Sequence, residues 1–316
     1  MTLQRRMSAL VGMTAVVVAA ALLLHALGTI PDGLYDVLTR SWPALLIVLG
    51  LGLLLPERLP LASVIVLGLS GALVAGVAYA AYTNRAGQLR DDQRVPIDQT
   101  VGDDVALLVV NVNILDTDVE VFSSSGARIG GEFTGSEASD IRVTYFETDD
   151  ARAEFTLTET RPDQLPRLEA VGRATLRLEI PETVAVAVVL DGNDGLMTLN
   201  MSTLELERLV LDLNRGDALV TLPAYQPLAA NAPEQPGLLT VRNGNLTVIV
   251  PPAVAMRMEL DRGGNNIRPE FDDSYILIDD GADGTLEKRA DTPDDIPLNY
   301  EVTVPRGLIR LQVAGQ

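Results

Sequence analysis

The chain of 316 residues contains no cysteine and a single histidine, His25. The lack of cysteine excludes disulfide bonds and thiolate chemistry. His25 lies within an apolar N-terminal run, so the rest of the chain has no histidine to act as a general base or to bind zinc. Catalytic sites of the Ser–His–Asp and Cys–His kinds are therefore not available to it.

Other signs of catalysis are also scarce. Aromatic residues make up 4% of the chain, which argues against a cleft that stacks sugars. No glycine-rich phosphate loop follows a strand and opens a helix. Paired carboxylates are common, but they carry little information in an acidic domain. We therefore expect a protein that is not an enzyme and holds no cofactor or metal.

The net charge of −19 is unevenly distributed along the chain. Residues 1–85 hold five arginines and three acidic residues, a balance of +2, which leaves 19 basic and 40 acidic groups, or −21, for residues 86–316. This acidic part should repel nucleic acid, which binds cationic surfaces. This negative charge either keeps the C-terminal part of the chain soluble in water or attracts cationic ligands.

Charged side chains are rare between Ser8 and Tyr82, where three apolar runs occur at 8–27, 42–55 and 61–82. The first and third have the ~20 residues that a membrane-spanning helix needs. The second is shorter, and Trp42 suits its membrane interface. A signal peptide is the competing interpretation of the first run. We expect a membrane anchor of about three transmembrane segments over 1–85, in contact with the lipid bilayer.

The third run carries small residues at every fourth position, which places them on one face of a helix. This face either packs within the protein or docks a partner, and its members are Gly68, Ala72, Gly76 and Ala80.

Arg5 and Arg6 favour a cytoplasmic N-terminus, and three spans would then place the C-terminal domain outside the cytoplasm. If the second run only dips into the membrane, the domain lies inside instead.

Residues 86–103 read as a polar linker, and an all-β domain is expected over 104–316. In Arg173–Ile180, for example, apolar and polar residues alternate, as in a strand with one buried face. Related units of a strand, a proline, a second strand and an Asn/Gly turn occur at 180–195, 200–216, 222–245 and 250–265, with a truncated copy at 304–315.

Such units bury their apolar faces by stacking, which predicts a stacked-repeat β-solenoid or a related stacked sandwich. Asn193, Asn214 and Asn243 would then occupy equivalent corners. A simple meandering sheet is the alternative. Residues 262–298, which include the acidic segment 270–297, interrupt the pattern. Within it, Asp279–Gly284 faintly resembles the start of a calcium loop but lacks key ligands, so a solvated acidic loop is favoured.

The run WPALLIVLGLGLLL from Trp42, together with the loop before it, resembles the membrane region of LiaF-type proteins over about residues 8–82. These proteins belong to bacterial responses to cell-wall-active antibiotics and envelope stress, and their rear domains are all-β and toastrack-like. The resemblance implies a multi-pass protein of the bacterial cell membrane that modulates a membrane sensor kinase or another envelope protein. It carries over no catalytic residue.

The leading hypothesis is thus a non-enzymatic regulatory or sensory protein of the cell envelope that acts through protein contacts. The alternative is a structural or adhesive module, displayed on the surface and able to self-associate.

Overall fold

A computed structural model describes residues 75–76, 79–162, 170–225, 236–263, 267–278, 283–288 and 298–315. Within these ranges the chain forms two compact units. The smaller unit includes the residues up to Gln88, together with Ser136–Ala138 and Arg161–Gly172. The larger unit is the β-domain, which comprises Leu89–Gly135, Ser139–Thr160 and Arg173–Gln316.

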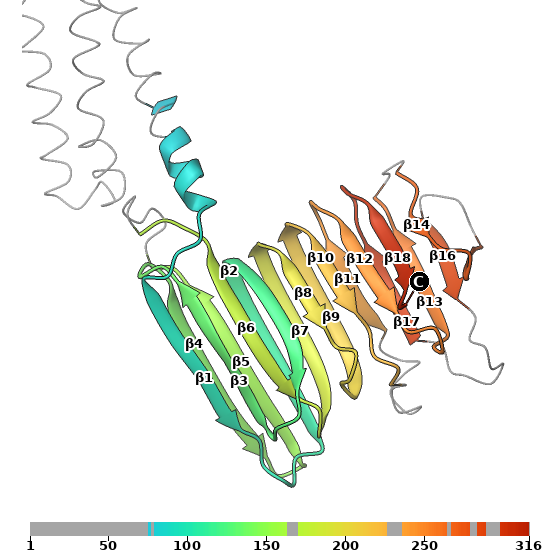
Figure 1. Ribbon diagram of the computed structural model, residues 1–316, viewed down its shortest axis with the longest axis horizontal. Helices are drawn as coiled ribbons and strands as arrows, with labels where there is room; N and C mark the ends of the chain where they lie inside the picture. Colours follow the sequence, from blue (N-terminus) through green and yellow to red (C-terminus); the bar gives the residue numbers. More distant parts are fainter. Residues whose placement is uncertain are drawn as a thin grey trace, which may run out of the picture. The chain divides into compact units, whose positions relative to one another are not determined.

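The β-domain contains strands β1 to β18, most of which are labelled in Figure 1, and this confirms the predicted all-β class. In chain order they are β1 (Gln93–Thr100), β2 (Leu107–Ser124), β3 (Arg128–Gly135), β4 (Asp140–Thr148), β5 (Arg152–Thr160), β6 (Ala174–Pro181), β7 (Ala185–Asp194), β8 (Met197–Asn200), β9 (Leu206–Arg215), β10 (Ala218–Thr221), β11 (Gly237–Val241), β12 (Leu246–Val250), β13 (Met256–Asp261), β14 (Glu270–Phe271), β15 (Tyr275–Leu277), β16 (Asp283–Lys288), β17 (Leu298–Thr303) and β18 (Ile309–Val313).

Strand β1 lies inside the segment 86–103 that was predicted to be a linker. It pairs antiparallel with β3 from Gln93 to Thr100, so the β-domain begins before residue 104. Pro96 lies within this strand, although proline cannot donate to a ladder. β1 is at a sheet edge, the position where proline is tolerated.

The strands form two sheets that share β2. Sheet 1 has the order β1, β3, β6, β2, β8, β10, β12, β18, β14. Sheet 2 has the order β4, β5, β2, β7, β9, β11, β17, β13, β16, β15. Residues Leu107–Asp116 of β2 pair within sheet 2, and Thr117–Ser124 pair within sheet 1. Hydrogen bonding is therefore continuous through all the strands.

Most of the domain is a stack of parallel rungs, visible from green to orange in Figure 1. We define a rung as one strand of sheet 2 that turns a corner into one strand of sheet 1. The rungs are β7–β8, β9–β10, β11–β12 and β17–β18, and the long strand β2 supplies one rung alone. Asn214 of β9 lies at the same register position as Asn193 of β7, and Asn243 follows at the next corner. The three asparagines therefore occupy equivalent corners, as the repeat predicted.

The spatial order of the rungs differs from their order in the sequence. β17–β18 lies between β11–β12 and β13, because β17 pairs with both β11 and β13. Residues 304–315 are therefore not a truncated copy. They form the corner and second strand of a complete rung whose first strand is Leu298–Thr303.

The core consists of apolar side chains from both sheets. Alternate residues of each strand point inward, as the period of two requires. One row of sheet 2 runs through seven strands at a single register position, and all its members are buried: Leu157, Val112, Leu190, Leu211, Leu239, Val302 and Leu260. Replacing one such leucine by alanine costs about 2–5 kcal/mol.

Candidate binding surface

The small-residue face predicted for the third apolar run is only partly described. Gly76 and Ala80 lie in a helical part of the chain and both are exposed. A Cβ added to Gly76 would meet no atom within 4 Å. Gly68 and Ala72 lie outside the described residues, as do His25 and the predicted spans at 8–27 and 42–55. Among the helices that the structure describes, none is long and apolar enough to cross a bilayer.

The corners of the rungs require glycine. A Cβ on Gly216 would lie 1.8 Å from the carbonyl oxygen of Gly195, and one on Gly244 would lie 1.8 Å from that of Gly216. A Cβ on Gly307 would clash in the same way with Gly244. Gly216 and Gly244 also have φ of +122° and +152°, which favours glycine. The glycines thus allow the corners to stack in direct backbone contact.

Polar side chains join each corner to the next. Asp217 Oδ1 accepts hydrogen bonds from the backbone N of Asn245 at 2.7 Å and from its Nδ2 at 3.1 Å. Asn245 Oδ1 accepts from the backbone N of Leu308 at 2.9 Å. Earlier in the stack, Asp118 Oδ1 accepts from the backbone N of Leu196 at 2.9 Å. These bonds fix the corners relative to one another.

An arginine cluster lies at the same corners. Arg173 Nη1 donates to Asp118 at 3.0 Å, and its Nη2 bonds Asp194. Arg215 Nη2 lies 3.1 Å from Asp194 Oδ2. Because these charged groups are partly exposed, their ion pairs add little to the stability of the fold. We infer that they mainly orient the corners.

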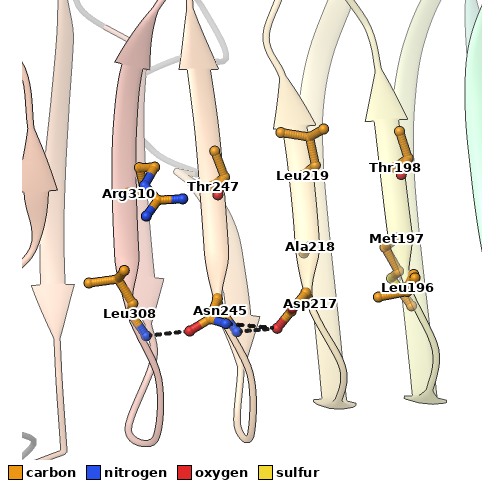
Figure 2. Close-up of a pocket in the computed structure, with 10 residues that line it drawn as sticks. All are labelled: Leu196, Met197, Thr198, Asp217, Ala218, Leu219, Asn245, Thr247, Leu308 and Arg310. Atoms are coloured by element: carbon orange, nitrogen blue, oxygen red, sulfur yellow. Dashed lines mark hydrogen bonds between the residues drawn. The ribbon is translucent and has the colours of Figure 1, made fainter.

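Next to these corners, the outer face of sheet 1 contains a hollow of about 310 Å³ (Figure 2). Strands β8, β10, β12 and β18 supply its floor and walls, which are formed by Leu196, Met197, Thr198, Asp217, Ala218, Leu219, Asn245, Thr247, Leu308 and Arg310. Leu196 is 51% exposed and Leu219 38%. The hollow therefore offers two leucine side chains to solvent among polar neighbours.

The register explains how the hollow is formed. Leu219 of β10 lies between Thr198 of β8 and Thr247 of β12, and Arg310 lies beyond Thr247 on β18. All four point away from the core because each alternates with buried residues. Arg310 Nε donates to Glu270 Oε2 on the neighbouring strand β14 at 2.8 Å. Its charge is therefore balanced at the rim of the hollow.

The charged and amide side chains of this lining already have partners within the domain. Asp217 already accepts two hydrogen bonds, Asn245 holds two neighbouring corners, and Arg310 is paired with Glu270. Among the described residues, no three His, Cys, Asp or Glu side chains gather in a way that could hold a metal ion. Part of the suspected calcium loop, residues 279–282, lies outside the described residues.

Sequence reasoning missed the hollow. The available signal was Leu219 in the strand Ala-Leu-Val-Thr, where alternation would place a polar residue on the outer face. Leu196, directly after the Asn/Gly turn, was the second signal. Neither could be assigned to a shared surface without the register that brings β8 and β10 together.

Comparison with known proteins identifies the N-terminal segment. Residues 9–54 match the LiaI-LiaF-like transmembrane region, which confirms the predicted resemblance for this part of the chain. A membrane-associated N-terminal region followed by a large all-β domain is therefore the class of protein defined here. No curated protein matches the chain.

Two solved structures are similar to this chain. One is a candidate cell adhesion protein from Clostridium sporogenes, with 13% identity, a TM-score of 0.55, and coverage of 70% of this chain and 100% of that chain. The other is a candidate adhesin from Bacteroides fragilis, with 8% identity, a TM-score of 0.20, and coverage of 70% and 97%. The first similarity shows a shared fold.

Proposed function

We propose that the protein is a non-enzymatic, membrane-anchored regulatory or sensory protein of the bacterial cell envelope. The observation that carries the proposal is the LiaI-LiaF-like transmembrane region at residues 9–54, which precedes an all-β domain with a hollow on the outer face of sheet 1. The partner we favour is a membrane sensor kinase, as in the best-known proteins with this type of membrane region. The β-domain would lie outside the cytoplasm, and the anchor would cross the bilayer more than once.

The hollow on sheet 1 is the contact surface we propose for that partner. Exposed Leu196 and Leu219 would supply apolar contact area, and Thr198 and Thr247 would supply hydroxyl groups at its sides. Protein interfaces combine an apolar centre with a polar rim in this way. We also class the parallel rungs as a toastrack-like solenoid, in which the corners display a continuous surface.

The test is co-purification of the full chain, solubilised from its native membrane, with identified sensor kinases. Leu219→Asp places a charge at the centre of the hollow and should reduce kinase recovery at least about fivefold, since buried unpaired charge is costly at an interface. Ile276→Asp is the matched control, because Ile276 is 48% exposed and lies on β15, an edge strand of sheet 2 away from the hollow. Recovery that is equal for both variants, or a stress response unchanged by deletion of the protein, would contradict the proposal.

The topology is tested separately by protease treatment of intact cells and opened vesicles. We expect the β-domain to be cleaved in intact cells. Protection in cells and cleavage only in vesicles that expose the cytoplasmic face would place the domain inside.

The second candidate function is a structural or adhesive surface module. The fold similarity to a candidate cell adhesion protein favours it, since it covers the whole of that chain. This function predicts that cells displaying the protein bind a surface or one another, and that deletion leaves kinase signalling unchanged.

A further inference from the structure

The two sheets have four edge strands among the described residues, and three of them are poor templates for another strand. In sheet 1, β14 has two residues and β1 contains Pro96. In sheet 2, β15 has three residues. Short edges and prolines protect natural sheets from edge-to-edge pairing. The fourth edge, β4, has nine residues without proline or glycine.

Strand β4 is well placed to accept a partner strand. It pairs antiparallel with β5 over its full length, from Asp140 opposite Thr160 to Thr148 opposite Arg152. Its other edge pairs with no strand that the structure describes. Glu147 Oε1 accepts hydrogen bonds from the backbone N of Gly102 at 3.0 Å and from the Tyr145 hydroxyl at 2.5 Å. These bonds hold the end of β4 in place.

The two faces of β4 follow from its partner. Arg142, Thr144 and Phe146 lie opposite Thr158, Thr156 and Glu154, which alternate with buried residues of β5 and therefore point outward. Val143 and Tyr145 lie opposite Leu157 and Phe155 and share the core side. Val143 nevertheless remains 38% exposed and Phe146 49%. The edge thus exposes apolar surface on both faces.

We propose that β4 pairs antiparallel with β4 of a second copy of this chain, with the two-fold axis at Thr144. In this register Arg142 of each copy lies opposite Phe146 of the other, so the dimer contains two such contacts. A guanidinium placed over an aromatic ring is attracted to it. Thr144 faces its own counterpart, a favourable cross-strand pair. On the core side, Val143 faces Tyr145 of the second copy and both lose exposed apolar surface.

The neighbouring registers are worse. An axis at Val143 would place Arg142 opposite Thr144, which removes both contacts between arginine and phenylalanine. An axis at Tyr145 would place Asp140 opposite Asp150, and like charges directly opposite destabilise a sheet. The axis at Thr144 is also the midpoint of Asp140–Thr148, so it uses all nine residues of the strand.

The expected contact is small and is favoured by the membrane. Nine residues of edge pairing form a weak dimer in dilute detergent, since stable interfaces bury about 1,200 Å² or more. Anchoring two copies in one bilayer raises their effective concentration without any new contact. The experiment therefore belongs in native membranes.

The lack of cysteine in the chain makes the test direct. Thr144→Cys in the full chain places one thiol beside its counterpart at the axis. Opposite residues of an antiparallel pair have Cα atoms about 4.5–5.5 Å apart, within the range that a disulfide spans. Mild oxidation of native membranes should give at least about ten times more linked dimer than Ser202→Cys, an exposed control position in the turn that follows β8. Equal yields for the two variants would overturn the proposal.

A second set of variants tests the register. With Thr144→Cys as background, Phe146→Lys places a cation opposite Arg142 of the second copy and should lower cross-linking at least about fivefold. Phe146→Glu places an anion opposite Arg142 of the second copy and should retain it, provided that circular dichroism shows a folded chain, since this position also lies opposite Glu154 of its own chain. Arg142→Glu combined with Phe146→Lys should restore it. Cross-linking that is indifferent to these charges would exclude the axis at Thr144.

Discussion

The side-chain amide of Asn214 donates a hydrogen bond at 3.1 Å to Oδ1 of Asn193, one rung earlier in the stack. Asn243, one rung later, donates from Nδ2 to the backbone oxygen of Asn214 at 3.1 Å. The three asparagines thus form a ladder along the same corners as the glycines. The ladder couples neighbouring rungs, so a defect at one corner should be felt at the next.

Gly216→Ala should destabilise the domain more than a typical glycine substitution. The added Cβ would lie 1.8 Å from the carbonyl oxygen of Gly195, and φ of +122° is strained for alanine. We expect a loss of at least about 3 kcal/mol, because backbone strain and a clash add. Urea unfolding of the detergent-solubilised chain, followed by its β-sheet circular dichroism signal, measures the change. Gly126→Ala is the control, since its Cβ would lie 3.7 Å or more from other atoms. Equal effects of both variants would contradict the role of the corner.

Glu159 is a buried carboxylate that should be essential for stability. It is 3% exposed and accepts hydrogen bonds from the backbone N of Leu115 at 2.8 Å, the hydroxyl of Thr117 at 2.7 Å and the hydroxyl of Ser139 at 2.7 Å. Glu159→Ala leaves these donors without their acceptor and should cost about 3–5 kcal/mol. The exposed Glu132→Ala should change stability by less than about 0.5 kcal/mol. A similar unfolding midpoint for both variants would refute this assignment.

The sequence predicted the equivalent corners of Asn193, Asn214 and Asn243 because residue type marks a turn that needs positive φ or side-chain hydrogen bonds. It could not predict that β17–β18 lies inside the stack. All rungs share the same backbone pairing and the same aliphatic inward faces, so the pattern does not say which rung follows which in space. Only the pairing of β17 with both β11 and β13 determines that order.

The sequence also did not predict that β2 belongs to both sheets. Apolar and polar residues alternate at Thr117–Phe122, as in a single strand within one sheet, but residues Leu107–Ser124 form one continuous strand that changes sheets. No proline or glycine marks that change of sheet, and Asp116, which lies at it, does not interrupt the strand. The hollow was missed because its two exposed leucines lie far apart in the sequence, with Leu196 just before β8 and Leu219 on β10. Its location depends on tertiary register, which local patterns do not encode.

Alkaline pH should unfold the domain through its tyrosines. Burial, followed by the hydrogen bond to Glu147, raises the pKa of Tyr145 to about 12. Burial is also the main cause that raises the pKa of Tyr225, Tyr275 and Tyr300. An unfolded phenol has a pKa of about 10, so these raised values add stability that is present below pH 10 and lost as pH rises through about 12 for Tyr145.

Phenolate absorbance against pH measures this effect. In the folded chain these tyrosines should ionise at higher pH than in the urea-unfolded chain. Tyr145→Phe should reduce the absorbance change in this high-pH part of the titration. Coincident titration curves for the folded and unfolded chain would show that the hydroxyl groups are not buried.

Lys288 is the only lysine of the chain, and its burial provides a clean probe of the folded state. It is 3% exposed on β16, and its Nζ donates to the backbone oxygens of Pro252 and Val254, both at 2.7 Å. Reagents that attack neutral amines need access to this nitrogen. Peptide mapping by mass spectrometry after brief labelling should therefore show no modification at Lys288. In urea Lys288 should react. Thr285→Pro, which cannot donate a backbone hydrogen bond within β16, should make Lys288 react without denaturant. Rapid labelling of Lys288 in the untreated protein would show that β16 does not stay closed against β13.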